Sequence, residues 1–501
     1  MHREKVTRRS FLGSAAAMTG TAALAGIAYS AADSQSEAQR IEAALPAGVF
    51  ARPRRSRRLL IFDRNVGYGG HRSIPTANRA FTRMGEKTGA YDTTVSRDPA
   101  VFAPESLGRF DAVFLNNTVG NLFEDPALRR SLVEFVYSGG GLMGVHGTTV
   151  AFTRWPGAHE DWPEFGIMLG ARGANHRIND EHVYIKLDDP DHPVNRPFDG
   201  KGFDYRDEFF RVHEPYSRDR VRVLMSIDTE KTDMQQGQAY GQVERADNDY
   251  ALAWVRQYGA GRVFYCTIAH HPSVFWDPKM LAFYLAATQF ALGDLIAPTT
   301  PSAKLTPAVE AQETLDWKLA LVPSTPEDET LFETIDKAAE LGLLYVGGHN
   351  RQKVSRNMPK HLGPRLDSNE RKQIRLKLDA AHVRLLTYRV DGPASEETQA
   401  FARTMGVETC LTAEGSTGTH VESLDEAHRR NDLAPLLHRA HRRGKPTIFA
   451  MASSNSMSEL AQRIDSFNNA ALRLLGENGR EHASPLRDSD RRFSSRSARH
   501  S

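Results

Sequence analysis

Short apolar runs that end in polar residues or glycine recur along the first half of the chain. They occupy residues 57–65, 110–120 and 141–147, and residues 129–140 between them carry apolar positions at i, i+3 and i+4 before Gly139. The runs predict buried strands, and the periodic segment predicts a helix closed by a glycine C-cap. Strands that alternate with helices indicate a mostly parallel sheet with helices on both faces.

The last part of this half predicts a hairpin and a helix, and the alternation of strands with helices then begins again. Residues 250–271 predict a hairpin with its turn at Gly259–Gly261, and residues 280–295 predict an amphipathic helix. Five further strand candidates follow, at 315–325, 341–349, 383–392, 407–415 and 445–454, with helices such as 329–341 and 369–381 between them. Strand–helix repetition without a hairpin predicts a β/α barrel, and a full barrel needs eight such units over about 250 residues. The second half is therefore expected to be an incomplete barrel.

These patterns divide the chain into six parts. Residues 1–32 form an export signal, and 33–56, with Pro46, Pro53 and a basic run, form a linker. The first domain covers 57–295, a Pro/Thr/Ala-rich linker covers 296–312, and the partial barrel covers 313–475. The Arg/Ser-rich stretch 476–501 is expected to be a disordered tail.

The composition excludes some kinds of partner and site but does not by itself indicate a function. A formal charge of +2, without Lys/Arg runs among aromatic residues, argues against a nucleic-acid partner. Two cysteines, Cys266 and Cys410, exclude a disulfide framework and a cysteine-rich metal site.

The N-terminal segment predicts export. Arg8 and Arg9 directly precede an uncharged stretch from Phe11 to Ser30 that is rich in Ala, Gly and Thr, with small residues near Ala31. This arrangement is typical of a twin-arginine signal, and it predicts a periplasmic or extracellular protein without a membrane span after cleavage. A membrane anchor is the alternative, although such a composition makes a weak spanning helix.

Several histidines of the first domain lie where strands are expected to end. His71, His146 and His270 follow predicted strands, and the carboxyl ends of parallel strands meet at one crevice. Imidazole is the commonest metal ligand in proteins and also titrates near neutral pH. With nearby carboxylates, the set suits either a metal site or acid–base chemistry. For each residue considered alone, the alternative is a turn or solvent-exposed position without a functional role.

We assign the candidate residues as follows. The predicted metal ligands are His71, His146, His176 and His270, and the predicted catalytic residues are His146, Asp207 and Glu208. Trp162 is a candidate for stacking on a sugar ring, with a core position as the alternative, and His192 is a second candidate for substrate binding, with a simple turn as the alternative. The glycine run 139–141 matches neither the dinucleotide-binding fingerprint nor a P-loop. We expect His146 to belong to a pocket and not to the core.

Residues 59–295 resemble the trehalose-utilisation (ThuA-like) family. The resemblance rests on "GYGGHRSIP", "DAVFLNNT", "SGGGLMGVHGTT", "EDWPEFGIMLGARGANH", "DPDHPVNRPF", "RDEFF" and "GRVFYCTIAHHPSVFWDP", which occur in family order. It implies a flavodoxin-like sheet of the class I glutamine-amidotransferase type. In true amidotransferases the turn after the central strand carries a cysteine nucleophile, whereas here that position is His146. Glutamine hydrolysis by a thiolate is therefore not expected.

The resemblance implies a role in carbohydrate metabolism, including that of 3-keto sugars. The favoured hypothesis is an exported, metal-dependent hydrolase, lyase or isomerase of sugars, with zinc as the first candidate metal. The alternatives are a non-catalytic carbohydrate-binding module and a scaffold for other sugar enzymes.

The second region resembles the xylose-isomerase-like sugar-phosphate isomerase/epimerase barrel, most clearly in "TLFETIDKAAELGLLYVGG". Glu414 would match one metal ligand of that family, but the strands that should carry the others are missing. A structural or docking role is expected for this domain.

Overall fold

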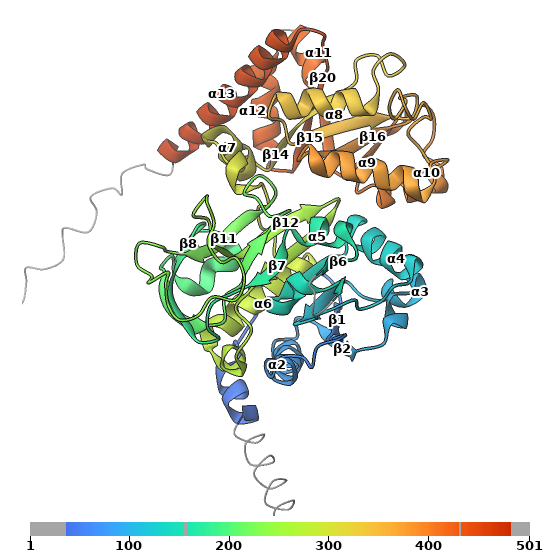
Figure 1. The fold of residues 1–501 in the computed structure, drawn as a ribbon. Coiled ribbons are helices and arrows are strands. Elements are labelled where there is room, and N and C mark those ends of the chain that lie inside the picture. Colours follow the sequence, from blue (N-terminus) through green and yellow to red (C-terminus); the bar gives the residue numbers. More distant parts are fainter. Residues whose placement is uncertain (1–36, 155–158, 430–431, 482–501) are drawn as a thin grey trace, which may run out of the picture. The chain divides into compact units, whose positions relative to one another are not determined.

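The computed structural model describes residues 37–154, 159–429 and 432–481. They divide into two compact units, with the boundary between Ala303 and Lys304 (Figure 1). The proposed export signal lies outside the described residues.

A mixed nine-stranded sheet forms the centre of the first unit. Its order is β2-β1-β3-β4-β13-β12-β11-β8-β9. The parallel half consists of β1 (Arg58–Phe62), β2 (Asp92–Ser96), β3 (Ala112–Asn116), β4 (Gly141–Val145) and β13 (Gly261–Cys266). The antiparallel half consists of β12 (Ala251–Tyr258), β11 (Arg222–Ile227), β8 (Glu181–Leu187) and β9 (Phe203–Asp207). The predicted hairpin is confirmed as β12–β13.

Helices cover both faces of this sheet, as predicted (Figure 1). Leu59 and Ile61 of β1 pack in one core with α2 (Ser73–Thr88) and α6 (Pro278–Leu292). Leu60 and Phe62 face a second core with α3 (Pro104–Leu107), α4 (Pro126–Tyr137) and α5 (Pro163–Leu169). The alternation follows from the period of two in a strand.

Helix α6 differs from the amphipathic helix that we expected. Its residues from Met280 to Leu292 are all buried except one, because the helix is covered on its outer side as well. Part of that cover is η3 (Pro193–Phe198), and part is the segment around Phe50 and Ala51, whose backbone bonds to the Gln289 side chain.

Shorter elements complete the first unit. They are η1 (Pro99–Phe102), η2 (His146–Val150), β5 (Thr153–Arg154), β6 (His159–Glu160), β7 (Arg172–Asn175), β10 (Arg211–His213), η4 (Pro272–Trp276) and η5 (Ser302–Lys304), the last spanning the unit boundary. Because β1, β3, β4 and β13 run in parallel, the loops that follow them lie at the same sheet edge.

The two segments expected to be linkers contain ordered structure. Residues 37–44 are helical, and Ile41, Ala44 and Leu45 are buried in the core of the first unit. Ser302 extends the edge of the same unit, since its hydroxyl accepts a hydrogen bond from the Val223 amide. The prolines and the basic run of the first segment, and the Pro/Thr/Ala-rich composition of the second, predicted linkers, whereas a few apolar residues tie the first segment to the core.

The second unit contains a seven-stranded sheet with the strand order β18-β17-β16-β15-β14-β20-β19. Its strands are β14 (Trp317–Val322), β15 (Tyr345–His349), β16 (Arg384–Arg389), β17 (Thr409–Thr412), β18 (Gly415–Thr417), β19 (His420–Ser423) and β20 (Thr447–Ala452). The last strand pairs with the first, as in a barrel, and the sheet is open between β18 and β19. The five strands predicted in this half are all present.

Helices connect most of the strands of the second unit, although β17, β18 and β19 follow one another directly. The helices are α7 (Pro307–Leu315), α8 (Leu331–Glu340), α9 (Ser368–Ala380), α10 (Glu396–Thr404), α11 (Leu424–Arg429), α12 (Leu433–Arg443) and α13 (Met457–Glu481). Helix α13 continues beyond Gly476, where we expected the tail to begin. No helix in the described part of the chain combines the length and the apolar character that crossing a membrane requires.

Candidate functional site

Four side chains from four separate loops meet at the carboxyl edge of the first sheet. His71 precedes α2, His146 follows β4, Glu208 follows β9 and His270 follows β13. One potential ligand atom from each lies within 4.8 Å of the others. We call this set the histidine cluster. Three of its members were predicted as metal ligands, and Glu208 was predicted as a catalytic residue.

His146 has no solvent exposure, and both of its ring nitrogens are engaged. Nδ1 lies 2.9 Å from the Thr267 carbonyl oxygen, and Nε2 lies 3.2 Å from Oε1 of Glu208. A carbonyl oxygen can only accept, so Nδ1 carries the proton and Nε2 presents a lone pair to the carboxylate. Burial, as the largest cause, lowers the pKa of His146 to about 3, which keeps the ring neutral. We expected a pocket residue and not a core residue, but His146 is both buried and part of the cluster.

Histidines surround the Glu208 carboxylate. Its Oε2 lies 3.3 Å from Nδ1 of His176 and 3.7 Å from Nε2 of His270, and the residue is 5% exposed. Among the described residues, no Lys or Arg forms an ion pair with it. A buried carboxylate without a cationic partner is costly unless a proton or a metal ion is supplied.

The two remaining histidines of the cluster each hold a buried Nδ1 without a hydrogen-bond partner among the described residues. Burial, reinforced by neighbouring histidines, lowers the pKa of His71 to about 2 and that of His270 to about 4. Both rings are therefore neutral at physiological pH and offer lone pairs. Neutral imidazole nitrogens and one carboxylate are donors that zinc accepts.

The structure places Asp207 at the loop that carries His270 and outside the four-residue histidine cluster. Its carboxylate is fully buried and accepts hydrogen bonds from the backbone amides of His270 and His271, at 3.1 and 2.9 Å. Burial raises its pKa well above the usual range. Asp207 thus holds the loop after β13 and places His270, while its neighbour Glu208 reaches the cluster.

The backbone at His146 is strained. His146 has φ 42°, in the left-handed region that non-glycine residues seldom occupy. The Tyr265 hydroxyl bonds to the His146 carbonyl, and the Asn117 side chain accepts from the Gly147 amide. A strained conformation persists when its surroundings fix it in this way, and such positions concentrate at functional sites.

His176 lies beside the cluster without joining its four-residue set. Its ring contacts Glu208 and stacks on Tyr240, with 5.0 Å between ring centroids and an interplanar angle of 24°. Tyr240 is 47% exposed, and its backbone pairs with that of His176. The sequence analysis did not predict Tyr240, because nothing near it in the sequence resembles a motif.

Tyr68 was also missed. Its ring lies 5.1 Å from that of His71, and burial together with Glu208 raises its pKa, so that the phenol stays protonated. Its place between the glycines of "GYGGH" was the available signal, since such loops bring backbone close to a ligand.

The two predicted substrate-binding residues lie elsewhere. Trp162 is 7% exposed and packs against Phe152 and Phe165 in the second core. His192 is 2% exposed; its Nδ1 accepts from the Val194 amide and its Nε2 donates to the Pro298 carbonyl. The structure gives both residues packing roles and brings neither into the histidine cluster.

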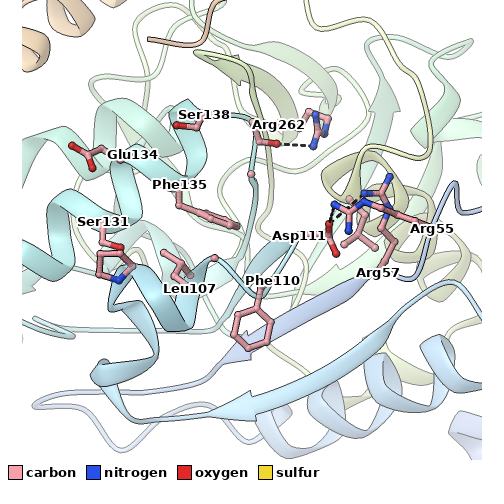
Figure 2. A pocket seen from close by; sticks show the side chains of 15 residues that line it. Arg55, Arg57, Leu107, Phe110, Asp111, Ser131, Glu134, Phe135, Ser138 and Arg262 are labelled. Atoms are coloured by element: carbon pink, nitrogen blue, oxygen red, sulfur yellow. Dashed lines mark hydrogen bonds and ion pairs between the residues drawn. The ribbon is translucent and has the colours of Figure 1, made fainter. Parts of the chain in front are cut away.

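A cavity of about 440 Å³ lies at the opposite sheet edge (Figure 2). Arg57 on its wall is paired with Asp294, and Arg262 donates to the carbonyls of Gly139 and Ala291, close to the ends of α4 and α6. A cation at helix C-termini stabilises them through the helix dipole. These charges therefore have a structural explanation, and we do not assign a ligand to this cavity.

Comparison with known proteins addresses the first unit. Residues 58–291 match the family model ThuA, described as trehalose utilisation. The resemblance seen in the ThuA-like region of the sequence is thus confirmed. No curated protein matches the chain. The likeness of the second unit to xylose isomerase stays a prediction.

Solved structures resemble the chain at low identity. A protein described as ThuA-like from Bacteroides uniformis has 17% identity and a TM-score of 0.38, and the match covers 48% of this chain and 91% of the other. A second, from Parabacteroides merdae, has 18% identity and a TM-score of 0.33, covering 47% and 91%. Gan42B, a GH42 β-galactosidase from G. stearothermophilus, has 10% identity and a TM-score of 0.28, covering 45% and 29%.

Proposed function

We propose that the first unit is a sugar-processing enzyme that binds a divalent metal ion at the histidine cluster. The observation that carries this proposal is the contact between Nε2 of His146 and Oε1 of Glu208. Both atoms are acceptors when the ring is neutral and the carboxylate is ionised, and a metal ion bound between them would make the contact favourable. Zinc is the first candidate, because three imidazoles and one carboxylate suit it.

Protein groups would supply the remaining chemistry. A bound divalent cation polarises a carbonyl or hydroxyl oxygen of the substrate. Glu208 faces His176 and His270 with its second oxygen, where it can hold a proton removed from the substrate. Tyr68, with its raised pKa, is a protonated donor at the side of His71.

The substrate class rests on the family. The matched model is described as trehalose utilisation, which supports a glycoside or 3-keto sugar as the substrate. The pair Arg8-Arg9 supports export by the twin-arginine route to the periplasm or beyond. Replacement of both by Lys should leave the protein in the cytoplasm, and fractionation of cells expressing each form measures this.

Metal analysis of the purified full chain tests the proposal. Elemental analysis should find close to one divalent metal ion per chain, and removing that metal should abolish turnover of a panel of glycosides and 3-keto glycosides. Binding of the sugars without turnover would favour a non-catalytic carbohydrate-binding module. Absence of stoichiometric metal from protein supplied with zinc would refute the metal proposal.

A further inference from the structure

Four aromatic rings lie in succession between the histidine cluster and the surface. They belong to His146, Phe210, His176 and Tyr240, with centroid separations of 4.0, 5.8 and 5.0 Å and interplanar angles of 34°, 31° and 24°. His146 has no solvent exposure and belongs to the cluster, whereas Tyr240 is 47% exposed. This aromatic stack therefore connects the proposed metal site with solvent.

Tyr240 is the only Phe, Trp or Tyr in the described part of the chain that is classed as exposed. Aromatic side chains gain much of their stabilising effect from burial, so an exposed ring forgoes that gain. One face of the Tyr240 ring lies on His176, and the exposure therefore falls on its opposite face and its edge. The outermost ring of the stack thus presents an open face to solvent.

The backbone holds Tyr240 in this position. Its amide donates to the His176 carbonyl at 2.7 Å, and its carbonyl accepts from the His176 amide at 3.2 Å. The next residue, Gly241, has φ 85°, and an added Cβ there would lie 2.5 Å from Oδ1 of Asn175 on β7. A ligand that packs on a ring fixed in this way has little of the chain to order, and this lowers the entropic cost of binding.

Tyr240 and Glu208 lie on different sides of the His176 ring. Glu208 faces the edge of this ring, at 3.3 Å from Nδ1, whereas Tyr240 covers one of its faces. The two stacked centroids are already 5.0 Å apart, so the open face of Tyr240 lies farther still from His176. A molecule that reaches both the cluster and this open face must therefore extend beyond a single sugar ring.

The segment around Tyr240 is polar but uncharged. Residues 234–243 include no charged side chain, and Gln238 and Gln242 on either side of the tyrosine are exposed. Amide side chains both donate and accept hydrogen bonds, as hydroxyl groups do, whereas a carboxylate or phosphate would find no cation in this segment. An aromatic face between neutral amides suits a sugar unit, which has C–H groups on its faces and hydroxyls around its rim.

We propose that Tyr240 forms a second sugar subsite, on which one unit of a glycoside stacks while another unit lies at the histidine cluster. The inference rests on the proposed function, because it names a substrate of at least two sugar units for the same site. Tyr240 acts as a specificity-determining residue and does not hold the metal. It thus takes the stacking role that the sequence suggested for Trp162, which lies in the second core.

Binding of saccharides to the full chain, supplied with zinc, tests this inference. The probes are methyl glucoside with one sugar unit, trehalose, maltose and cellobiose with two, and phenyl glucoside with one unit and an aromatic aglycone; calorimetry measures their affinities. The variants are Tyr240→Ala and Tyr240→Phe. Ile296→Ala is the matched control, since Ile296 is an exposed apolar residue that follows α6 and has no place in the stack. Metal content is measured on the same samples.

In the parent, at least one disaccharide should bind about tenfold or more tightly than methyl glucoside, because only the disaccharide reaches the ring. Tyr240→Ala should remove this advantage and leave the affinity for methyl glucoside within about twofold of the parent, whereas Tyr240→Phe and the control should keep the advantage. Metal content should stay unchanged. A merely structural role of Tyr240, as a support for His176, would weaken the binding of one-unit and two-unit ligands alike.

Three results would overturn the inference. They are a parent that binds no disaccharide more tightly than methyl glucoside, an equal loss of both affinities in Tyr240→Ala, and an effect of Tyr240 that is confined to phenyl glucoside. Each of these leaves the metal result standing. Conversely, a disaccharide advantage that depends on Tyr240 in a chain that takes up no metal would support the subsite and refute the metal site.

Discussion

At His146, the two ring nitrogens serve different purposes. Nδ1 bonds to the Thr267 carbonyl and fixes the ring, and Nε2 faces Glu208. The backbone bond thus selects the tautomer that leaves Nε2 free for a metal ion, a common arrangement for metal-binding histidines. The strained φ of 42° shows that the fold maintains this position at an energetic cost.

Two substitutions at this position separate the roles of the ring nitrogens. Asn can place its amide nitrogen near Nδ1, keeps the bond to Thr267 and tolerates a positive φ, but it has no counterpart of Nε2. We expect His146→Asn to lower zinc affinity at least about 100-fold while the free energy of unfolding falls by less than about 1 kcal/mol.

His146→Ala should lose zinc affinity as well, and it should also lose about 1–3 kcal/mol because the buried Thr267 carbonyl is left without a partner. Zinc titration and thermal unfolding of the metal-free proteins measure both effects. Normal zinc affinity in His146→Asn would show that Nε2 is not a ligand.

Because His192 is buried, we expect the free energy of unfolding to depend on pH. Burial lowers its pKa to about 4, whereas an unfolded histidine titrates near about 6.5. Between these values the unfolded state binds the proton and the folded state does not, so this histidine lowers stability as the pH falls from about 6.5 to about 4. Its effect should be absent above about pH 7 and reach about 2 kcal/mol at about pH 5.

His192→Asn is the matched variant, because Asn keeps the N-cap acceptor for Val194 and cannot titrate. It also loses the Nε2 donor to the Pro298 carbonyl, so it should be less stable than the parent at about pH 8, and this difference should change by about 2 kcal/mol in favour of the variant at about pH 5. Thermal midpoints of both proteins at the two pH values provide the comparison. The other histidines are common to both chains and cancel. Parallel pH profiles of the two midpoints would contradict this account.

The sequence placed the cluster correctly because strand ends are visible in it. His71, His146 and His270 each follow an apolar run, and parallel topology brings such positions together. Trp162 and His192 show the limit of this reasoning. Their sequence surroundings describe local turns, whereas their partners, such as Phe152 and Pro298, are fixed by packing between distant segments.

At the scale of elements, one glycine ties together the loops that carry the site. The Gly120 amide donates to the Val150 carbonyl, and its own carbonyl accepts from the Phe152 amide. Its φ is 84°, and an added Cβ would lie 2.0 Å from the Val66 carbonyl oxygen. The loops after β1, β3 and β4 therefore approach one another at a point where only glycine fits.

Gly120→Ala should accordingly destabilise the first unit by about 2–4 kcal/mol, from the strained φ together with the clash. It should also weaken zinc binding, because the loops that carry His71 and His146 must separate. Gly89→Ala is the control: it has φ 66° but nothing within 4 Å of the added Cβ, so only the conformational cost of about 1–2 kcal/mol applies. Equal midpoints for the two variants would remove the clash from the explanation.

The helices and strands were easier to predict from the sequence than the distant segments that pack against them. The apolar runs predicted β1, β3, β4 and the β12–β13 hairpin of the first half and five strands of the second half, whose last strand closes on the first as in a barrel. They did not predict β2 or the antiparallel strands β8, β9 and β11. What the pattern did not reveal is the cover of α6, because whether a helix is buried on one side or all round depends on segments far away, such as residues 37–51.

At the scale of the whole molecule, the boundary between the units determines what can be tested separately. The division falls between Ala303 and Lys304, and Ser302 hydrogen-bonds the strand β11 through Val223. Upstream, Ile41 and Leu45 are 1% and 6% exposed in the core of the same unit. The first unit therefore extends from about residue 37 to 303, beyond the 57–295 that the sequence pattern suggested.

A fragment of residues 37–303 should fold alone and bind one zinc ion per chain with the affinity of the full protein. A shorter fragment, 57–298, lacks the apolar contacts of Ile41 and Leu45, each worth roughly 1.5–3 kcal/mol when buried, and should be less stable by about 3 kcal/mol or more. Unfolding midpoints and zinc titrations of both fragments beside the full chain measure these effects. If 37–303 folds cooperatively but binds no zinc while the full chain does, the assignment of the histidine cluster as a self-sufficient metal site is wrong.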